Sequence, residues 1–255
     1  MCRLLAYIAP EPVAPRDLLG DGLECFVHLS HSHADGWGIA GFVEDGNLTC
    51  AKAAEPAYSS AEFARLVERL RADAFVAHLR WATPGLRLSQ ENTHPFVTDG
   101  FAFAHHGRAG PFDKLNGLIS QGRRSALGGT TDSERLFLAL MSAYDGSATL
   151  EDAYRTLLIA AGRELEYTSL NSVLLTPREV YALCWYDPQN SAVREEMRKD
   201  SGYYDLRYGI DRGAVVIASQ GWGGERWERV PNGHALAVQR GTLETRLVEV
   251  AGRQT

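Results

Sequence analysis

Eight short runs of aliphatic and aromatic residues, each bounded by turn-forming residues, restrict the fold of this chain more than any other feature. Runs of this length and composition predict β-strands. Segments 45–47 and 176–178 have the composition of hairpin turns, so the strands beside them are predicted to pair antiparallel. The predicted strands span residues 3–9, 38–43, 74–81, 100–105, 170–176, 180–186, 213–219 and 235–240.

Helical periodicity separates groups of these strands. Apolar residues recur every three to four positions in 61–71, 132–143 and 150–161, which predicts helices with one apolar face each. Because each apolar face has to be covered by another layer, the pattern predicts a layered α+β domain. Segment 187–204 is polar and is expected at the surface, whereas 220–231 is expected to form a Gly- and Trp-rich loop.

The length, composition and charge of the chain indicate its number of domains and the kind of molecule that it binds. The 255 residues are 45% hydrophobic, enough for one substantial core, so residues 1–255 are predicted to form a single domain. A net charge of −6 without a run of like charges gives no attraction to nucleic acid or an anionic membrane, which favours a small-molecule partner. The four cysteines form no CxxC pair, no signal peptide is evident, and the apolar stretches are too short to cross a bilayer. A cytoplasmic protein with reduced thiols is therefore expected.

The cysteine that follows the initiator methionine is the first feature that indicates chemistry. Removal of Met1 would place a thiol and a free α-amine on Cys2. An α-amine has an ordinary pKa of about 8, low enough to accept a thiol proton near neutral pH, and a thiolate is a strong nucleophile. Cys2 could therefore supply both nucleophile and base, although a buried strand cysteine would look the same.

Two further segments place polar groups at strand boundaries. Asp35-Gly36-Trp37-Gly38 indicates a turn that enters a strand, with glycines that allow close backbone approach. Arg80 lies near the end of another predicted strand and is followed by Thr83. A guanidinium in that place can bind a carboxylate with two hydrogen bonds, although an ordinary surface ion pair would show the same pattern.

Histidines gather in two loops beside strands. His94 lies in the sequence Asn-Thr-His-Pro-Phe, and His105 and His106 precede Gly107, whose N–H could stabilise an oxyanion. Hydrogen-bonded structural histidines would explain the same residues. A metal bound by His33 and these histidines is the competing interpretation, but their spacing matches no standard zinc pattern, so no metal is predicted.

Asp132 begins a predicted helix, in the sequence Thr-Asp-Ser-Glu of residues 131–134. Helix capping alone could explain an acidic residue there. A carboxylate in this position could also receive the ammonium group of a substrate. Together with Arg80 it would then hold both charged ends of an α-amino acid.

Taken in order, these segments resemble the class II glutamine amidotransferases over roughly residues 1–140. Stand-alone members are the most similar in appearance, including the ergothioneine-pathway γ-glutamyl hydrolase and the glutathione-degrading amidotransferase subunit. Residues 218–220 and 227–234 resemble their C-terminal region more weakly. The resemblance rests on Met1-Cys2-Arg3, Asp35-Gly36-Trp37-Gly38, Arg80-Trp81-Ala82-Thr83, Asn92-Thr93-His94-Pro95-Phe96, His105-His106-Gly107 and Thr131-Asp132-Ser133-Glu134.

The resemblance implies a four-layer αββα sandwich of two antiparallel sheets and no cofactor. It implies that Cys2 attacks a γ-glutamyl carbonyl and that its own α-amine acts as base. Other implied roles are binding of the substrate α-carboxylate by Arg80 with Thr83 nearby, and of the α-amine by Asp132. Gly107 would donate its N–H to the oxyanion. His94 and Trp37 are further candidates for substrate contacts.

One position departs from the family pattern. The family usually has His-Asn-Gly where this chain has His105-His106-Gly107, and the asparagine amide completes the oxyanion hole. An imidazole N–H can also donate a hydrogen bond, so we hypothesise that His106 replaces the asparagine. Three functions follow: a γ-glutamyl amide hydrolase, a glutaminase that supplies ammonia to a separate synthetase partner, or a γ-glutamyl-binding module with impaired chemistry. The leaving amine is not identified by the sequence.

Overall fold

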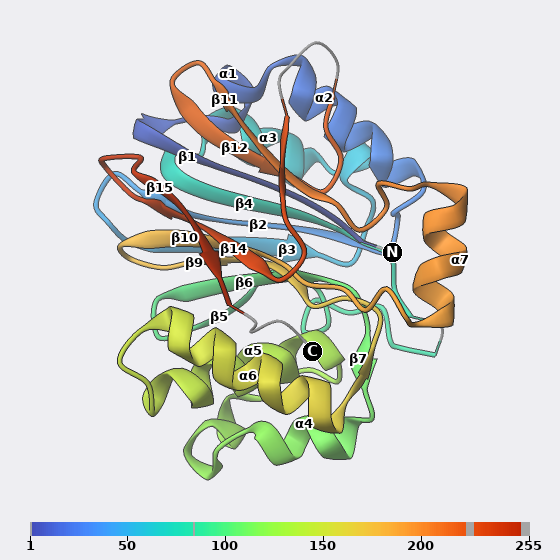
Figure 1. Ribbon diagram of the computed structural model, residues 1–255. Coiled ribbons are helices and arrows are strands. Elements are labelled where there is room, and N and C mark those ends of the chain that lie inside the picture. Colours follow the sequence, from blue (N-terminus) through green and yellow to red (C-terminus); the bar gives the residue numbers. More distant parts are fainter. Residues whose placement is uncertain (1, 84, 223–226, 251–255) are drawn as a thin grey trace.

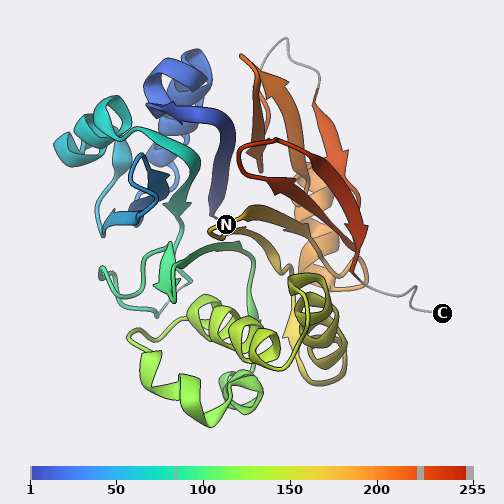
Figure 2. The same ribbon diagram turned by 90° about the vertical axis from the view of Figure 1, so that its left-hand side faces the viewer.

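Two antiparallel sheets lie face to face in the computed structural model, which describes residues 2–83, 85–222 and 227–250 (Figure 1). Helices α1, α2 and α3 cover the outer face of one sheet, and α4, α5 and α6 cover the outer face of the other (Figure 2). The α+β class and the four-layer αββα sandwich expected from the sequence are confirmed.

The first sheet has seven strands in the order β13-β11-β12-β1-β4-β2-β3. All its pairings are antiparallel, and β1 and β4 lie near its centre. The predicted hairpin at 45–47 is confirmed between β2 and β3. The strands are β1 (Arg3–Val13), β2 (Gly36–Val43), β3 (Leu48–Ala53), β4 (Ala72–Arg80), β11 (Leu206–Asp211), β12 (Ala214–Ala218) and β13 (Glu228–Val230).

The second sheet has six strands in the order β15-β14-β10-β9-β6-β5. The predicted hairpin at 176–178 joins β9 and β10. A separate two-stranded sheet pairs β7 with β8. The strands are β5 (Phe96–Thr98), β6 (Phe101–His106), β7 (Ala109–Gly110), β8 (Glu166–Tyr167), β9 (Asn171–Leu175), β10 (Glu179–Cys184), β14 (His234–Gln239) and β15 (Thr245–Glu249).

The three helices predicted from periodicity are confirmed as α3 (Ala61–Arg69), α5 (Asp132–Asp145) and α6 (Leu150–Glu164). Each begins at a Ser or Thr whose hydroxyl accepts a backbone N–H of the first turn. Four helices were not predicted, since three have eight residues or fewer and the fourth buries one side chain, Val193. They are α1 (Pro15–Leu19), α2 (Asp21–His28), α4 (Phe112–Leu118) and α7 (Ser191–Lys199).

Two sequence expectations are refined. The polar segment 187–204 does lie apart from the two sheets, but it contains α7, beside the start of β1 (Figure 1). Within segment 220–231, expected to be a loop, residues Glu228–Val230 form strand β13 at the edge of the first sheet, and 223–226 lie outside the described residues.

Strand alternation sorts side chains into three cores. On β1, Leu4, Ala6 and Ile8 point between the sheets, whereas Leu5 and Tyr7 point toward the first helical layer. On β6, the even-numbered alanines point between the sheets and Phe103 points toward α5 and α6. The direction of each polar side chain at the strand ends is therefore fixed by its position in this alternation.

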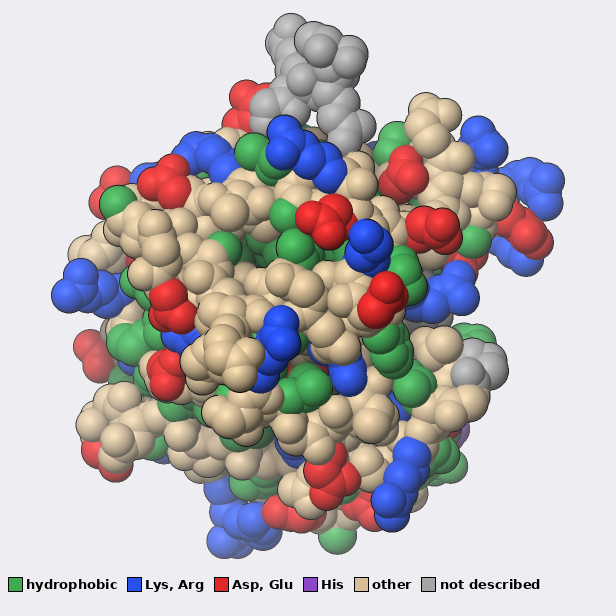
Figure 3. Space-filling view, turned by 90° about the horizontal axis from the view of Figure 1, so that it is seen from below, with side chains coloured by type: hydrophobic (Ala, Val, Ile, Leu, Met, Phe, Trp, Pro, Cys, Tyr) green, Lys and Arg blue, Asp and Glu red, His purple; other side chains and the backbone are tan. Residues whose placement is uncertain are grey.

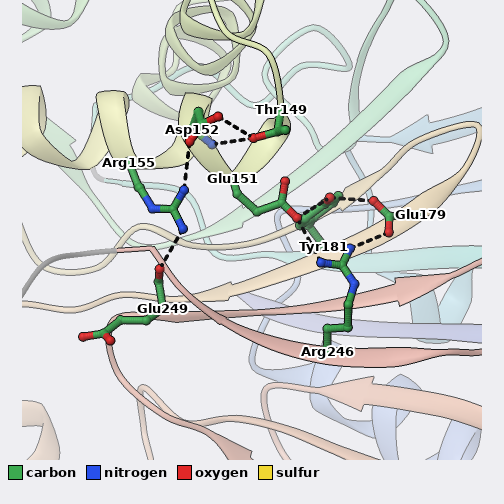
Figure 4. A network of polar contacts seen from close by, with 8 residues as sticks. All are labelled: Thr149, Glu151, Asp152, Arg155, Glu179, Tyr181, Arg246 and Glu249. Atoms are coloured by element: carbon green, nitrogen blue, oxygen red, sulfur yellow. Dashed lines mark hydrogen bonds and ion pairs between the residues drawn. The ribbon is translucent and has the colours of Figure 1, made fainter.

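A polar network attaches α6 to the second sheet (Figure 4). Arg246 on β15 pairs with Glu179 on β10 at 2.6 Å and with Glu151 on α6 at 3.3 Å. The hydroxyl of Tyr181 lies between the two carboxylates, 2.6 Å from Glu179 and 3.1 Å from Glu151. These contacts fix the second helical layer in register with the sheet.

The surface offers no broad field of one sign on the face seen in Figure 3, where acidic and basic side chains are interspersed. Across the described ranges, no helix is long and apolar enough to cross a membrane.

Candidate active site

Cys2 directly precedes β1, where that strand begins between β4 and β12. Its half-buried thiol contacts the residue after β4: the Trp81 N–H donates to Sγ at 3.4 Å, and Sγ lies 3.7 Å from the Trp81 carbonyl. Burial raises the pKa of the Cys2 thiol, while the Trp81 N–H and the charge of Arg80 act in the opposite direction. The thiol therefore needs a base to become a nucleophile near neutral pH.

Arg80 is the last residue of β4 and lies at the same end of the sheet as Cys2. Its side chain is buried, and Nη2 donates to the carbonyl of Arg87 at 3.2 Å. Nη1 has no hydrogen-bond partner among the described residues. A buried, half-satisfied guanidinium is costly unless an anion completes its hydrogen bonds, so the position suits a carboxylate ligand.

Asp35 fixes the chain that follows Arg80. Its N–H donates to the Arg80 carbonyl at 3.2 Å, and its Oδ2 accepts from Ala82 N at 2.7 Å. The turn at Asp35 thereby holds the segment that carries Trp81 and Thr83. Thr83 is half-buried within this segment.

The glycines beside Asp35 make room for the turn at His94. A β-carbon on Gly38 would lie 1.9 Å from the carbonyl oxygen of His94, and one on Gly36 would lie 3.1 Å from the Thr93 side chain. From the other side, Lys52 Nζ donates to the carbonyls of Thr93 at 2.8 Å and Pro95 at 3.1 Å. This packing brings His94 beside β2 and β4.

His94 is buried behind the Arg80 end of β4. Its ring lies 4.0 Å from that of His78 and 4.7 Å from that of Phe96, and neither ring nitrogen has a partner among the described residues. Burial holds the pKa of His94 well below its usual value, so the ring is neutral. The structure places His94 in a buried aromatic cluster near Arg80.

The side chains of His105 and His106 point to opposite faces of β6. His106 is fully buried with no hydrogen-bond partner in the described parts of the chain, and its ring centroid lies 5.9 Å from those of Tyr203 and Tyr204. Burial and the charge of Arg3 hold its pKa well below the usual value. His105 instead reaches Ser133 on α5. The two rings therefore point away from each other.

Gly107 follows directly and packs closely against residue 169. A β-carbon at Gly107 would lie 1.8 Å from the carbonyl oxygen of Ser169. The main chain approaches so closely that glycine is required here.

Asp132 is the first residue of α5 and is 9% exposed. Its Oδ2 accepts from Ala109 N at 2.9 Å, and its Oδ1 accepts from Ser133 N at 2.9 Å. Its negative charge contributes to raising the pKa of Cys2, as expected of a carboxylate near the thiol. The carboxylate oxygens retain lone pairs for a further donor.

Asn92 connects the Arg80 segment to the start of α5, a link that the sequence did not suggest. Its side-chain amide donates to the Arg87 carbonyl at 3.1 Å and to Thr130 Oγ1 at 3.0 Å, and its Oδ1 accepts from Thr130 N at 2.7 Å. Arg80 also donates to the Arg87 carbonyl. One buried amide thus joins the carbonyl that Arg80 contacts to Thr130, two residues before Asp132.

Trp37 is not brought to the site. It lies on the outer face of the first sheet, fully buried, with its ring 5.3 Å from that of Phe63 on α3. Since Leu79 on the same outer face is its strand partner, the sheet itself separates Trp37 from the side chain of Arg80. The expected substrate contact is therefore replaced by core packing.

Two other tryptophans have defined places. Trp81 is 52% exposed beside the ring of His33, whereas Trp222 packs against the first helical layer. As for the metal interpretation, no group of three or more His, Cys, Asp or Glu within residues 2–83, 85–222 and 227–250 is arranged to hold a metal ion.

Tyr203 and Tyr204 were missed by the sequence analysis. They follow α7 and reach the site only because this excursion folds back beside the start of β1 (Figure 1). The guanidinium of Arg3 lies 5.1 Å from the ring centroid of Tyr203. An aromatic pair at the end of a polar segment was the signal that could have marked them.

The fold of this chain is shared with solved structures. Two stacked antiparallel sheets with a cysteine at the start of a central strand define an N-terminal-nucleophile hydrolase fold. Solved structures share it: a glutamine aminotransferase class-II domain protein from Silicibacter pomeroyi superposes with a TM-score of 0.68 at 18% identity, over 98% of this chain and 100% of that one. Glutamine PRPP amidotransferase from Bacillus subtilis gives 0.68 at 18% identity, over 98% of this chain and 49% of that one.

The family model of class-II glutamine amidotransferases matches residues 1–254, and the chain belongs to this family of amidohydrolases. A probable glutamine amidotransferase of Saccharomyces cerevisiae, DUG3, is 28% identical over 57% of this chain and 46% of its own length. The γ-glutamyl-hercynylcysteine sulfoxide hydrolase of Mycolicibacterium smegmatis is 24% identical over 94% of this chain and 96% of its own. The match thus spans less than half of the yeast relative.

Proposed function

We propose that this protein hydrolyses the γ-glutamyl amide bond of glutamine or of a γ-glutamyl conjugate, through a γ-glutamyl thioester on Cys2. One observation carries the proposal: the thiol of Cys2 contacts Trp81, the residue after Arg80, whose buried guanidinium has a nitrogen without a partner among the described residues, and the charges of Arg80 and Asp132 both act on the pKa of the thiol. A cation and an anion near a nucleophile suit the α-carboxylate and α-ammonium of a γ-glutamyl group. Thr83 and His94 lie in the segments that build this clamp.

The reaction has two halves. Sγ attacks the γ-carbonyl carbon, and the thiol proton passes to the α-amine of Cys2 and from there to the leaving amine as the C–N bond breaks. Water then attacks the thioester, transfers its proton through the same amine to Sγ, and releases glutamate. This route requires that Met1 be removed, since an acylated amine is not a base.

The oxyanion formed in each half needs preorganised donors. The N–H of Gly107 is one, and His106 is the second in this proposal. A neutral imidazole carries one N–H, and in the described parts of the chain no protein acceptor occupies either ring nitrogen of His106. A donor without a protein acceptor, buried next to Gly107, suits this role.

The replacement of the usual asparagine by His106 also supports a second candidate function. If the ring does not reach the oxyanion, the clamp would remain without efficient chemistry, and the protein would bind a γ-glutamyl ligand in a regulatory role. A third possibility is that glutamine-derived ammonia passes to a synthetase partner. Product analysis separates these functions, because only hydrolysis releases free glutamate and an amine without a partner protein.

The first test is intact-mass analysis before and after incubation with 6-diazo-5-oxo-norleucine, an electrophilic glutamine analogue. Loss of Met1 and a single adduct on Cys2 is the expected result, abolished in Cys2→Ala and retained in Cys25→Ala, whose thiol is exposed elsewhere. A processed but unlabelled protein would contradict the proposal.

Turnover is then measured with glutamine and with γ-glutamyl amides of larger amines, following glutamate release. His106→Ala should lower kcat by about 100-fold if the imidazole is an oxyanion donor. Unchanged turnover would exclude that role for His106. Tight binding without turnover in the unmodified protein would favour the binding module.

A further inference from the structure

Gly107 is held on both sides by the first two residues of α5. On its N-terminal side, His105 Nδ1 lies 2.9 Å from Ser133 Oγ. On its C-terminal side, Ala109 N donates to Asp132 Oδ2 at 2.9 Å. The same helix start that carries the carboxylate proposed to bind the substrate ammonium therefore also fixes the loop proposed to hold the oxyanion.

The contacts of His105 define which nitrogen carries its proton. Nε2 lies 3.0 Å from the carbonyl oxygen of Ser169, which can only accept, so Nε2 is the N–H donor. Burial lowers the pKa of His105, which favours the neutral ring. Nδ1 therefore accepts the hydroxyl proton of Ser133. Ser133 Oγ also lies 3.3 Å from Asp132 Oδ1, a longer contact than the 2.9 Å to His105 Nδ1, so the single hydroxyl proton is assigned to the histidine.

Ser169 completes the connection. Its carbonyl oxygen, the acceptor of His105, is also the atom closest to the position that a β-carbon on Gly107 would occupy. His105 is thus hydrogen-bonded both to the carbonyl that Gly107 packs against and to the helix that carries Asp132. A shift of Ser133 or His105 would move Gly107 relative to Asp132.

We propose that His105 and Ser133 are positioning residues that set the oxyanion donor Gly107 against the ammonium-binding carboxylate Asp132, which makes efficient turnover depend on this buried contact. The inference rests on the proposed function. Neither residue touches the reacting atoms, since His105 points away from the space between the sheets. Their loss should therefore lower kcat while KM changes little, because donors that act in the transition state are displaced.

The test uses γ-glutamyl-p-nitroanilide as a chromogenic probe with the processed, full-length protein. Ser133→Ala removes the hydroxyl, and His105→Phe keeps a ring but removes both hydrogen bonds. Each should lower kcat about 10- to 100-fold, the effect of a small misplacement of catalytic groups, with KM within about threefold. Ser133→Thr, which keeps the hydroxyl, should recover most of the rate. Ser142→Ala on the same helix is the matched control.

Misfolding is separated from misplacement by counting active sites. The fraction of molecules labelled at Cys2 by 6-diazo-5-oxo-norleucine, which requires a folded glutamyl pocket, is measured by mass once labelling has reached its plateau, and kcat is expressed per labelled site. A normal kcat per site in Ser133→Ala, or a change in KM alone, would overturn the proposal. If the unmodified protein binds the probe but never cleaves it, the proposed hydrolase function fails instead, and the positioning role fails with it.

Discussion

The carbonyl oxygen of His94 lies only 1.9 Å from the point where a β-carbon on Gly38 would stand. Glycine at this position therefore lets the turn at residues 92–95 pack directly on β2. The second glycine of the sequence Asp-Gly-Trp-Gly therefore leaves space for a turn that lies more than fifty residues further along the chain.

Gly38→Ala should destabilise the protein, because the added methyl group meets the main-chain carbonyl of His94, in a turn whose two neighbouring carbonyls accept from Lys52. A loss of about 1–3 kcal/mol in the free energy of unfolding is expected, the usual effect of overpacking. Urea unfolding measures it, with Gly122→Ala as control, since nothing lies within 4 Å of a β-carbon there. Equal midpoints for the two variants would refute the steric argument.

Arg80→Met should weaken productive binding of glutamine, because it removes the charged donors proposed for the α-carboxylate. We expect kcat/KM to fall by about 100-fold, the scale of hydrogen bonds to a charged group. Arg65→Met, on the exposed face of α3, is the matched control. Steady-state glutaminase assays check it, and a parallel loss in both variants would argue against a specific role.

Asp132→Asn should reduce the preference of the enzyme for substrates that carry an α-ammonium group over those that lack it. The variant keeps the shape and its amide oxygen can still accept from Ala109 N, but the negative charge is lost. Comparing γ-glutamyl-p-nitroanilide with glutaryl-p-nitroanilide, which lacks the amine, should show about a tenfold or larger loss for the first substrate alone. Equal losses for both would mean that Asp132 acts only as a structural residue.

The reactivity of Cys2 should depend on pH in a defined direction. Because burial raises its pKa, the rate of alkylation by iodoacetamide should reach its midpoint at a higher pH than that of an ordinary peptide thiol. Arg80→Met should move the midpoint higher still, since a positive charge that stabilises the thiolate is lost. A midpoint that moves down in this variant would contradict the placement of Arg80 near the thiol.

Acid should destabilise the fold through its buried histidines. Burial lowers the pKa of His78 to about 3, and the pKa values of His94 and His106 lie well below 6.5. Below pH 6.5 the unfolded chain binds protons that the folded chain does not, so the free energy of unfolding falls as pH falls. Each such histidine contributes up to about 1.4 kcal/mol per pH unit.

His106→Asn isolates one of these contributions. Urea midpoints measured between pH 7.5 and 5 should fall less steeply in this variant than in the unmodified protein, because one histidine no longer takes up a proton on unfolding. Identical slopes would mean that His106 is not buried in its neutral form.

The amino-acid sequence by itself determined eight of the strands, three of the helices and the identity of the family, whereas the shorter or more polar strands, such as β5 and β13, were not predicted. Strand alternation and helical periodicity are local properties, and Cys2, Arg80 and Asp132 stand in segments whose residues follow one another in the chain. Their order was sufficient to suggest a clamp for a γ-glutamyl group before any contact was known.

Only the tertiary structure decided where the remaining side chains point. Trp37 faces α3, and His105 and His106 face opposite sides of β6, because neighbouring residues of a strand alternate between faces and the covered face depends on the pairing partner. Likewise Tyr203 reaches His106 only through the folding back of a polar excursion. Such contacts join residues far apart in the chain, and no local pattern encodes them.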